Sequence, residues 1–87
     1  MARRKLSFAW QTILRALDRY GDEGVIEDTF IAVMGDPDAG GYRNHAKDVL
    51  SQMFFTGVEY YERHPDDRSK IRITAKGKDA LEHGEET

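Results

Sequence analysis

Two stretches of this sequence repeat apolar residues at the spacing of one helical face, and a glycine follows each of them. The first set is Trp10, Ile13, Leu14 and Leu17, and the second is Ala46, Val49, Leu50 and Met53. Side chains at i, i+3, i+4 and i+7 lie on one side of an α-helix. We therefore expect a first helix from Ser7, its N-cap, to Tyr20, with Gly21 as its stop. The second set predicts a helix over residues 42–55 that ends before Gly57.

Shorter elements are expected around these two helices. Val25 and Ile26 read as a very short strand, and Asp28 as the N-cap of a short helix through Met34. The inward side chains of that helix are expected to be Phe30, Val33 and Met34. The segment 36–41 is rich in turn residues, although Asp36 before Pro37 can equally cap an early start of the next helix.

The last third of the chain predicts a hairpin and a final helix. Residues 58–64 are rich in strand formers, and residues 65–69 read as a loop. Residues 70–73 alternate polar and apolar side chains, as a half-buried strand does. Thr74 is a candidate N-cap for a helix over residues 75–83, which Gly84 ends. We divide the chain into a flexible basic arm (1–6), an α+β domain (7–84) and an acidic tail (85–87).

Composition narrows the class of protein. The chain has 87 residues, enough for one small domain, and no cysteine, which excludes disulfides and thiolate metal sites. No apolar run suits a signal peptide or a membrane span, so we expect a cytoplasmic protein without a membrane partner. The net charge is −3, with a sequence pI of about 5.5. The charge is segregated, however, since residues 1–17 carry +4 and residues 18–39 carry −6.

Two segments resemble a known superfamily. Leu50-x-x-Met53-x-x-x-Gly57-Val58 is similar to the end of the recognition helix in winged helix-turn-helix regulators. Ile71-x-Ile73-Thr74-x-Lys76-Gly77-x-x-x-Leu81 resembles the segment that closes the wing in MarR-like and PadR-like proteins. The resemblance implies three helices, a two- to three-stranded hairpin wing and a short C-terminal helix. These specific motifs cover only residues 46–81, and the long extra helices with which those families dimerise are missing.

The resemblance implies that the third helix enters the major groove of double-stranded DNA and that the wing follows the backbone. The helix candidates for DNA contact are Tyr42, Arg43, Asn44, Lys47 and Ser51, on an outward face that also holds Asp48 and Gln52. The wing candidates are Arg68, Lys70 and Arg72. Arginine, asparagine and glutamine can read base edges, and cations bind phosphates. The alternative is a solvated helix face, which Asp48 favours, beside a hairpin whose cations pair with Glu59 and Glu62.

Four aromatic residues are candidates for a protein interface: Phe54, Phe55, Tyr60 and Tyr61. Adjacent helix positions diverge by about 100°, so one core pocket cannot receive both phenylalanines. Either Phe55 is displayed to a partner or a second copy, or the helix ends early and Phe55 folds beneath the hairpin or the first helix. Tyr60 and Tyr61 are expected on opposite strand faces, with one of them displayed.

The sequence thus predicts a DNA-binding winged-helix protein, a small transcriptional regulator. The alternative is a winged-helix interaction module that does not bind DNA, such as an adaptor or inhibitor protein, of a size that would fit an accessory protein encoded by a mobile element. We expect no enzyme, because nucleophile, phosphate-loop and zinc motifs are missing. The histidines lack metal-ligand spacing, so neither a metal nor a cofactor is expected.

Overall fold

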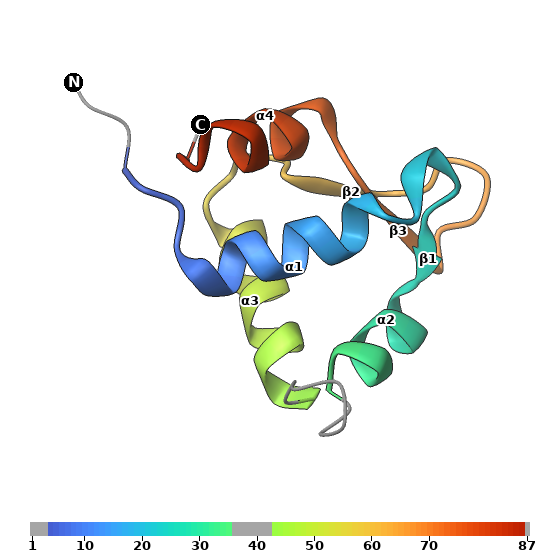
Figure 1. The fold of residues 1–87 in the computed structure, drawn as a ribbon. Helices are drawn as coiled ribbons and strands as arrows, with labels where there is room; N and C mark the ends of the chain where they lie inside the picture. The colour runs from blue at the N-terminus through green and yellow to red at the C-terminus, as the bar shows by residue number, and fades with distance from the viewer. Residues whose placement is uncertain (1–3, 36–42, 87) are drawn as a thin grey trace.

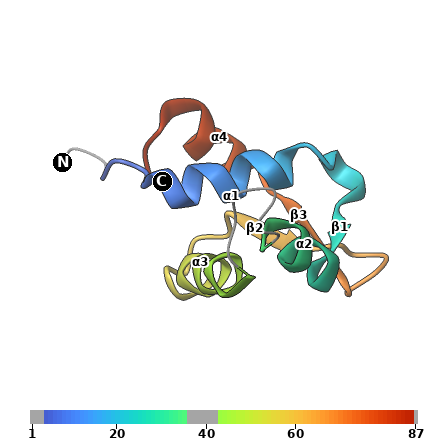
Figure 2. The ribbon, with the colours of Figure 1, turned by 60° about the horizontal axis from the view of Figure 1, so that its bottom comes forward.

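The computed structural model describes residues 4–35 and 43–86, and the side chains of residues 43–45 lie outside this description. The elements run in the order α1 (Phe8–Asp18), η1 (Gly21–Glu23, a 3₁₀ turn), β1 (Val25–Ile26), α2 (Glu27–Met34), α3 (Arg43–Phe55), β2 (Tyr61–Arg63), β3 (Lys70–Ile73) and α4 (Ala75–His83). The described chain is therefore an α+β fold with four α-helices, and α1 lies between α4 and the α2–α3 pair (Figures 1 and 2).

The three strands form one antiparallel sheet in the order β1-β3-β2. The expected alternation in β3 is confirmed, because Ile71 and Ile73 are buried while Lys70 and Arg72 are half-buried. The other expected strand, over residues 58–64, shortens to β2. Its first residues make local bonds instead, since the N–H of Val58 donates to the Thr56 hydroxyl and that of Tyr60 to the carbonyl of Val58.

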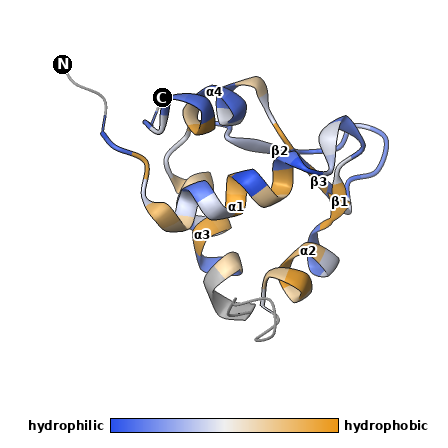
Figure 3. Ribbon diagram, viewed as in Figure 1, coloured by the Kyte–Doolittle hydropathy of each residue, from blue (hydrophilic) through white to orange (hydrophobic). Residues whose placement is uncertain are grey.

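The core joins all the helices to the sheet. It consists of Leu6, Ile13, Leu14, Leu17, Val25, Phe30, Ala46, Val49, Leu50, Met53, Tyr60, Ile71, Ile73 and Ala80. The loop between β2 and β3 is hydrophilic (Figure 3) and contributes nothing to this core. Because the inner side of α3 is buried in this core, the other side of the helix faces solvent next to the hairpin.

Most expected helix ends are confirmed. The Ser7 side chain accepts from the N–H of Trp10 at 3.2 Å, and that of Thr74 from the N–H of Gly77 at 3.1 Å. Gly84 ends α4 in the left-handed conformation with φ +67°. Gly21 has φ +60° and begins η1, while α1 itself stops earlier than expected, at Asp18.

Two expectations for α2 are wrong. The helix starts at Glu27 without a side-chain cap, because Ile26 ends β1 directly before it and the N–H of Glu27 donates to the carbonyl of Ser69 at 2.9 Å. Asp28 therefore has no capping role. Val33 is 48% exposed rather than buried, whereas Ile31 packs against the core with Met34.

The terminal boundaries are also wrong where the structure describes them. Lys5 and Glu85 form an antiparallel β-bridge. We give the name terminal clasp to this bridge and its neighbours Arg4, Leu6, Gly84 and Glu86. The N–H of Leu6 donates to the carbonyl of Gly84, and the N–H of Glu86 to that of Arg4, both at 2.8 Å. Leu6 is only 2% exposed, so residues 4–6 belong to the domain rather than to a flexible arm.

Candidate interaction face

The exposed side of α3 is the first part of the candidate site. We call it the α3 face, and its described side chains are Lys47, Asp48, Ser51, Phe54 and Phe55. It faces solvent because the opposite side of the same helix enters the core at every third or fourth position. One cation, one anion and two phenyl rings therefore share a face that a DNA-reading helix would fill with polar groups.

The predicted DNA contacts on α3 divide into two groups. Lys47 and Ser51 are exposed as expected. Arg43 begins α3 and Asn44 follows it, but their side chains lie outside the described part, as does the whole of Tyr42. The backbone of α3 therefore carries four of these five candidates, and the structure gives the surroundings of two.

Lys47 and Ser51 line a groove of about 360 Å³ between α2, α3 and β2. The other lining residues are Glu27, Asp28, Ile31, Leu50 and Tyr61. Two carboxylates from the first turn of α2 thus share the groove with the one described cation of α3. Their negative charge weakens the attraction of this region for phosphate.

Gln52 is exposed, but its side-chain oxygen is engaged within the protein. Its side-chain oxygen accepts a hydrogen bond from Nε1 of Trp10 at 3.1 Å. The Trp10 ring packs edge-on against Tyr60, with centroids 5.6 Å apart. The amide that was expected on the outward face therefore links α3 to α1.

The hairpin cations divide into paired and unpaired groups. Arg72 lies 3.6 Å from Glu62 on the neighbouring strand, and Arg63 lies 3.0 Å from Glu27 of α2. The expected pairing of hairpin cations with Glu62 is confirmed. Arg68 and Lys70 form no ion pair within the described ranges. Arg72 is thus a poorer candidate for phosphate contact than the other two.

The loop of the hairpin is fixed by local hydrogen bonds, which hold the Asp67 carboxylate in place. Asp67 accepts from the hydroxyl of Ser69 at 2.6 Å and from its N–H at 3.0 Å, which lowers the pKa of the Asp67 carboxyl. The N–H of Asp66 donates to Nδ1 of His64 at 3.0 Å. Asp66 and Asp67 thus place two carboxylates directly before the unpaired Arg68 in the chain.

Phe54 and Phe55 are both displayed. They are 71% and 84% exposed, and their rings meet edge-on with centroids 6.0 Å apart. The alternative in which the helix ends early and Phe55 folds inward is wrong, because α3 continues through Phe55. Most of the surface of each ring therefore faces solvent.

The two tyrosines behave differently from expectation, since neither is displayed. Tyr60 is 1% exposed, and Tyr61 is half-buried with its hydroxyl donating to the carbonyl of Leu50 at 3.2 Å. Burial raises the pKa of Tyr61, the charge of Glu27 adds to this, and Arg63 partly opposes it. The strand alternation failed here because β2 begins only at Tyr61, so a bend turns both rings inward.

A second groove, of about 470 Å³, lies between the end of α3 and the hairpin. We call it the α3–hairpin groove, and its lining is Phe54, Gly57, Val58, Glu59, Tyr61, Glu62, Arg63 and Arg68. Gly57 has φ +79° and open space where a side chain would stand, so the chain turns sharply without closing the groove. Apolar and charged groups thus adjoin the exposed phenyl rings.

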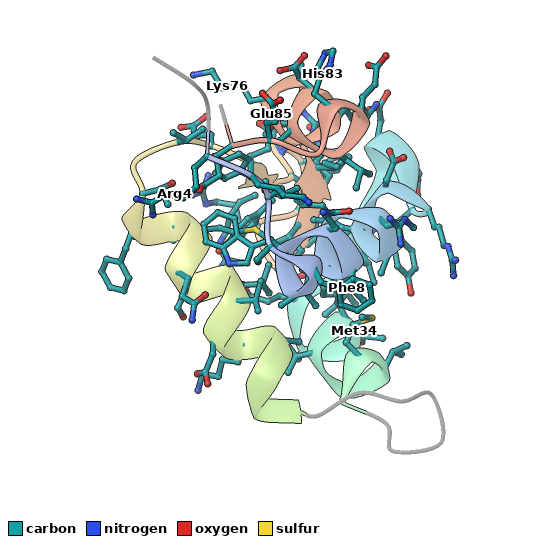
Figure 4. All side chains as sticks on the ribbon, turned by 60° about the vertical axis from the view of Figure 1, so that its left-hand side comes forward. Arg4, Phe8, Met34, Lys76, His83 and Glu85 are labelled. Atoms are coloured by element: carbon teal, nitrogen blue, oxygen red, sulfur yellow. The ribbon has the colours of Figure 1, made fainter. Side chains whose placement is uncertain are left out.

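The described ranges contain neither a cluster suited to a metal ion nor a helix suited to a membrane. No cluster of three or more histidine, cysteine or acidic side chains there could hold a metal ion. His83 and Lys76 point outward from α4 (Figure 4), and Nε2 of His83 lies 3.3 Å from Asp79. No described helix has the length and apolar character that a membrane crossing requires.

Comparison with known proteins adds no family assignment. No family model matches the chain, and neither a curated protein nor a solved structure does.

Proposed function

We propose that this chain is a winged-helix domain. The order of α1, β1, α2, α3 and a hairpin supports this, as does a sheet in which β3 lies between β1 and β2. The two motif segments lie where such a domain needs them, one at the end of α3 and the other from β3 into α4. In such a domain, α3 and the hairpin form the surface that meets a macromolecule.

We propose that this surface binds another protein, as an adaptor or inhibitor subunit would. The observation that carries the proposal is the pair of exposed phenylalanines on consecutive positions of α3. Phenylalanine is enriched in protein interfaces and buries about 150–250 Å² per side chain. Two such side chains supply roughly 300–500 Å² of the ~800 Å² that each partner buries in a standard interface.

The electrostatics of the surface support a protein partner as well. Arg63 and Arg72 are already paired with carboxylates, and Asp48 is exposed on the α3 face. Glu27 and Asp28 line the groove next to Lys47. Together with the net charge of −3, these groups leave a weak positive field for a polyanion.

A displayed peptide library tests the protein-binding proposal directly. Peptides selected on the wild-type domain are expected to lose at least about tenfold in affinity for the double variant Phe54→Ala/Phe55→Ala. Phe8→Ala is the matched control, because Phe8 is 80% exposed but belongs to α1. Affinity should change little with salt. Equal binding to the double variant and the wild type would refute the proposal.

A second candidate function is the binding of double-stranded DNA as a transcriptional regulator. The observation that favours it is that Lys47, Arg68 and Lys70 form no ion pair within the described ranges and lie on α3 and the hairpin. Cations on these two elements can contact adjacent phosphates. Arg43 and Asn44, at the start of α3, remain candidates for base contact.

Fluorescence anisotropy with a mixed pool of duplexes separates the two functions. A DNA-binding domain should show affinity whose logarithm falls with the logarithm of salt by about 0.9 per phosphate contact. The variant Arg43→Ala/Lys47→Ala should then bind more weakly, with Lys78→Ala on α4 as the control. No binding at low salt would eliminate the DNA function and leave the protein-binding one.

A further inference from the structure

We propose that the partner at this surface is a second copy of the chain, bound around a two-fold axis through the Phe54–Phe55 pair and the α3–hairpin groove. This inference rests on the proposed protein-binding function and names its partner.

The charges at the groove provide the first argument. Of its four charged side chains, Arg63 and Glu62 already have partners, in Glu27 and Arg72. The other two, Glu59 and Arg68, are exposed and form no ion pair with the described residues. The groove therefore presents one unpaired acid and one unpaired base.

A two-fold interface can use such a pair of charges twice. In a two-fold dimer each contact occurs in both directions, so that residue i meets residue j and residue j meets residue i. Glu59 of one copy can therefore meet Arg68 of the other, while the reciprocal contact forms at the same time. The unpaired acid and base of one groove are therefore complementary to the same two groups of a second groove.

The shape and the apolar groups provide the second argument. The groove has a volume of about 470 Å³, which lies within the range of sites that enclose a drug-sized ligand, so it has room for an aromatic side chain. Val58 and Tyr61 in its lining offer apolar contact, and the mouth is bordered by Phe54 itself. Each copy thus has both the exposed rings and a cavity that can receive them.

The size of the patch supports a reversible dimer. Two phenylalanines on each side supply roughly 300–500 Å² per copy, with the groove walls adding to this. A total near the lower end of specific interfaces is expected, and such interfaces form weak or transient complexes. Binding of DNA to the same face would compete with this dimer.

Sedimentation equilibrium on the full chain tests the proposal. The wild type should approach the mass of two chains as concentration rises, whereas Phe54→Ala/Phe55→Ala stays monomeric and Phe8→Ala dimerises like the wild type. Circular dichroism should show all three folded, because each changed ring is at least 71% exposed.

Charge reversal provides the sharper measurement. Glu59→Arg alone and Arg68→Glu alone each place like charges opposite one another, and each should weaken the homodimer by about tenfold or more. An equimolar mixture of these two single variants should recover association, because both reciprocal contacts are again between opposite charges. The double variant Glu59→Arg/Arg68→Glu should recover it within one chain.

The outcomes separate this inference from the proposed function. A wild type that stays monomeric up to about 1 mM, the weak end of specific binding, would overturn the second-copy assignment. So would a dimer that survives the loss of both phenylalanines, or single charge variants that do not rescue each other. Selected peptides could still require Phe54 and Phe55, in which case the protein-binding function would stand with another partner.

Discussion

Gly77 lies where the chain has no room for a side chain. A Cβ built at this position clashes with the carbonyl oxygen of Tyr60 and comes within 2.7 Å of Cγ1 of Ile73. The same turn holds Thr74, whose hydroxyl donates to the carbonyl of Glu59 and accepts from the N–H of Gly77. The Thr-x-Lys-Gly pattern in the sequence therefore has a local reason, namely close packing of α4 on the segment before β2.

Replacing Gly77 with alanine should destabilise the domain. We expect Gly77→Ala to lower the free energy of unfolding by about 2 kcal/mol or more, because the clash involves backbone that cannot rotate away. A gain of about 1 kcal/mol in helix propensity offsets part of the cost. Urea denaturation measures the change.

The control for this substitution is Lys78→Ala in the same helix. Lys78 is exposed, so its loss should change the free energy of unfolding by no more than about 0.5 kcal/mol. Similar stabilities for the two variants would mean that α4 can shift away from Tyr60.

At the scale of elements, the terminal clasp is the least expected feature. Its hydrogen bonds join a segment before α1 to the end of α4, and Arg4 lies 3.7 Å from Glu86 across it. Six residues are too few for a periodic pattern, and three of the first five carry positive charge. Only tertiary contacts, namely the hydrogen bonds of the clasp and the packing of Leu6 into the core, reveal that the segment is structural.

Truncating Leu6 tests the clasp. Leu6→Ala should cost about 2–4 kcal/mol in free energy of unfolding, because a buried leucine loses its contacts and leaves a cavity. Phe8→Ala, two positions along, should cost much less since its ring is 80% exposed. Thermal and urea unfolding compare the two variants. Equally small effects would contradict the clasp and support the prediction that residues 1–6 form a flexible arm.

The hairpin shows how an ion pair across two strands changes the charge that a strand presents. From sequence, Lys70 and Arg72 form one cationic strand face. In the structure, Glu62 lies directly across from Arg72 in the register and neutralises it. The element is therefore a salt-bridged hairpin whose unpaired cations, Arg68 and Lys70, lie near its tip.

For the whole molecule, stability should come from apolar burial rather than from charge. No charged or polar residue is buried among the described residues, and their ion pairs all lie on exposed or half-exposed side chains. Such pairs contribute about 0–1 kcal/mol each and are screened by salt.

The free energy of unfolding should accordingly depend little on ionic strength. We expect a change below about 1 kcal/mol between ~0.05 M and ~1 M sodium chloride. Urea titrations at one fixed protein concentration measure it, since a dimer would make stability depend on concentration. A loss of several kcal/mol at high salt would show that the surface pairs matter more than their exposure suggests.

The sequence alone determined the helices with strong apolar periodicity, the alternation of β3, and the caps at Ser7, Thr74 and Gly84. These features depend on neighbours within a few residues, so local spacing and residue type suffice to predict them. The order of the predicted helices and strands along the chain then indicated an α+β fold with four helices and a sheet.

Tertiary structure decided which of the candidate site residues are free to act. Glu27 reaches Arg63 across 36 positions and Trp10 reaches Gln52 across 42, so no local pattern could reveal either contact. The same long-range packing buried Tyr60 and left Phe54 and Phe55 uncovered. A helical wheel fixes directions around one axis, but only the placement of the other elements decides which directions meet protein and which meet solvent.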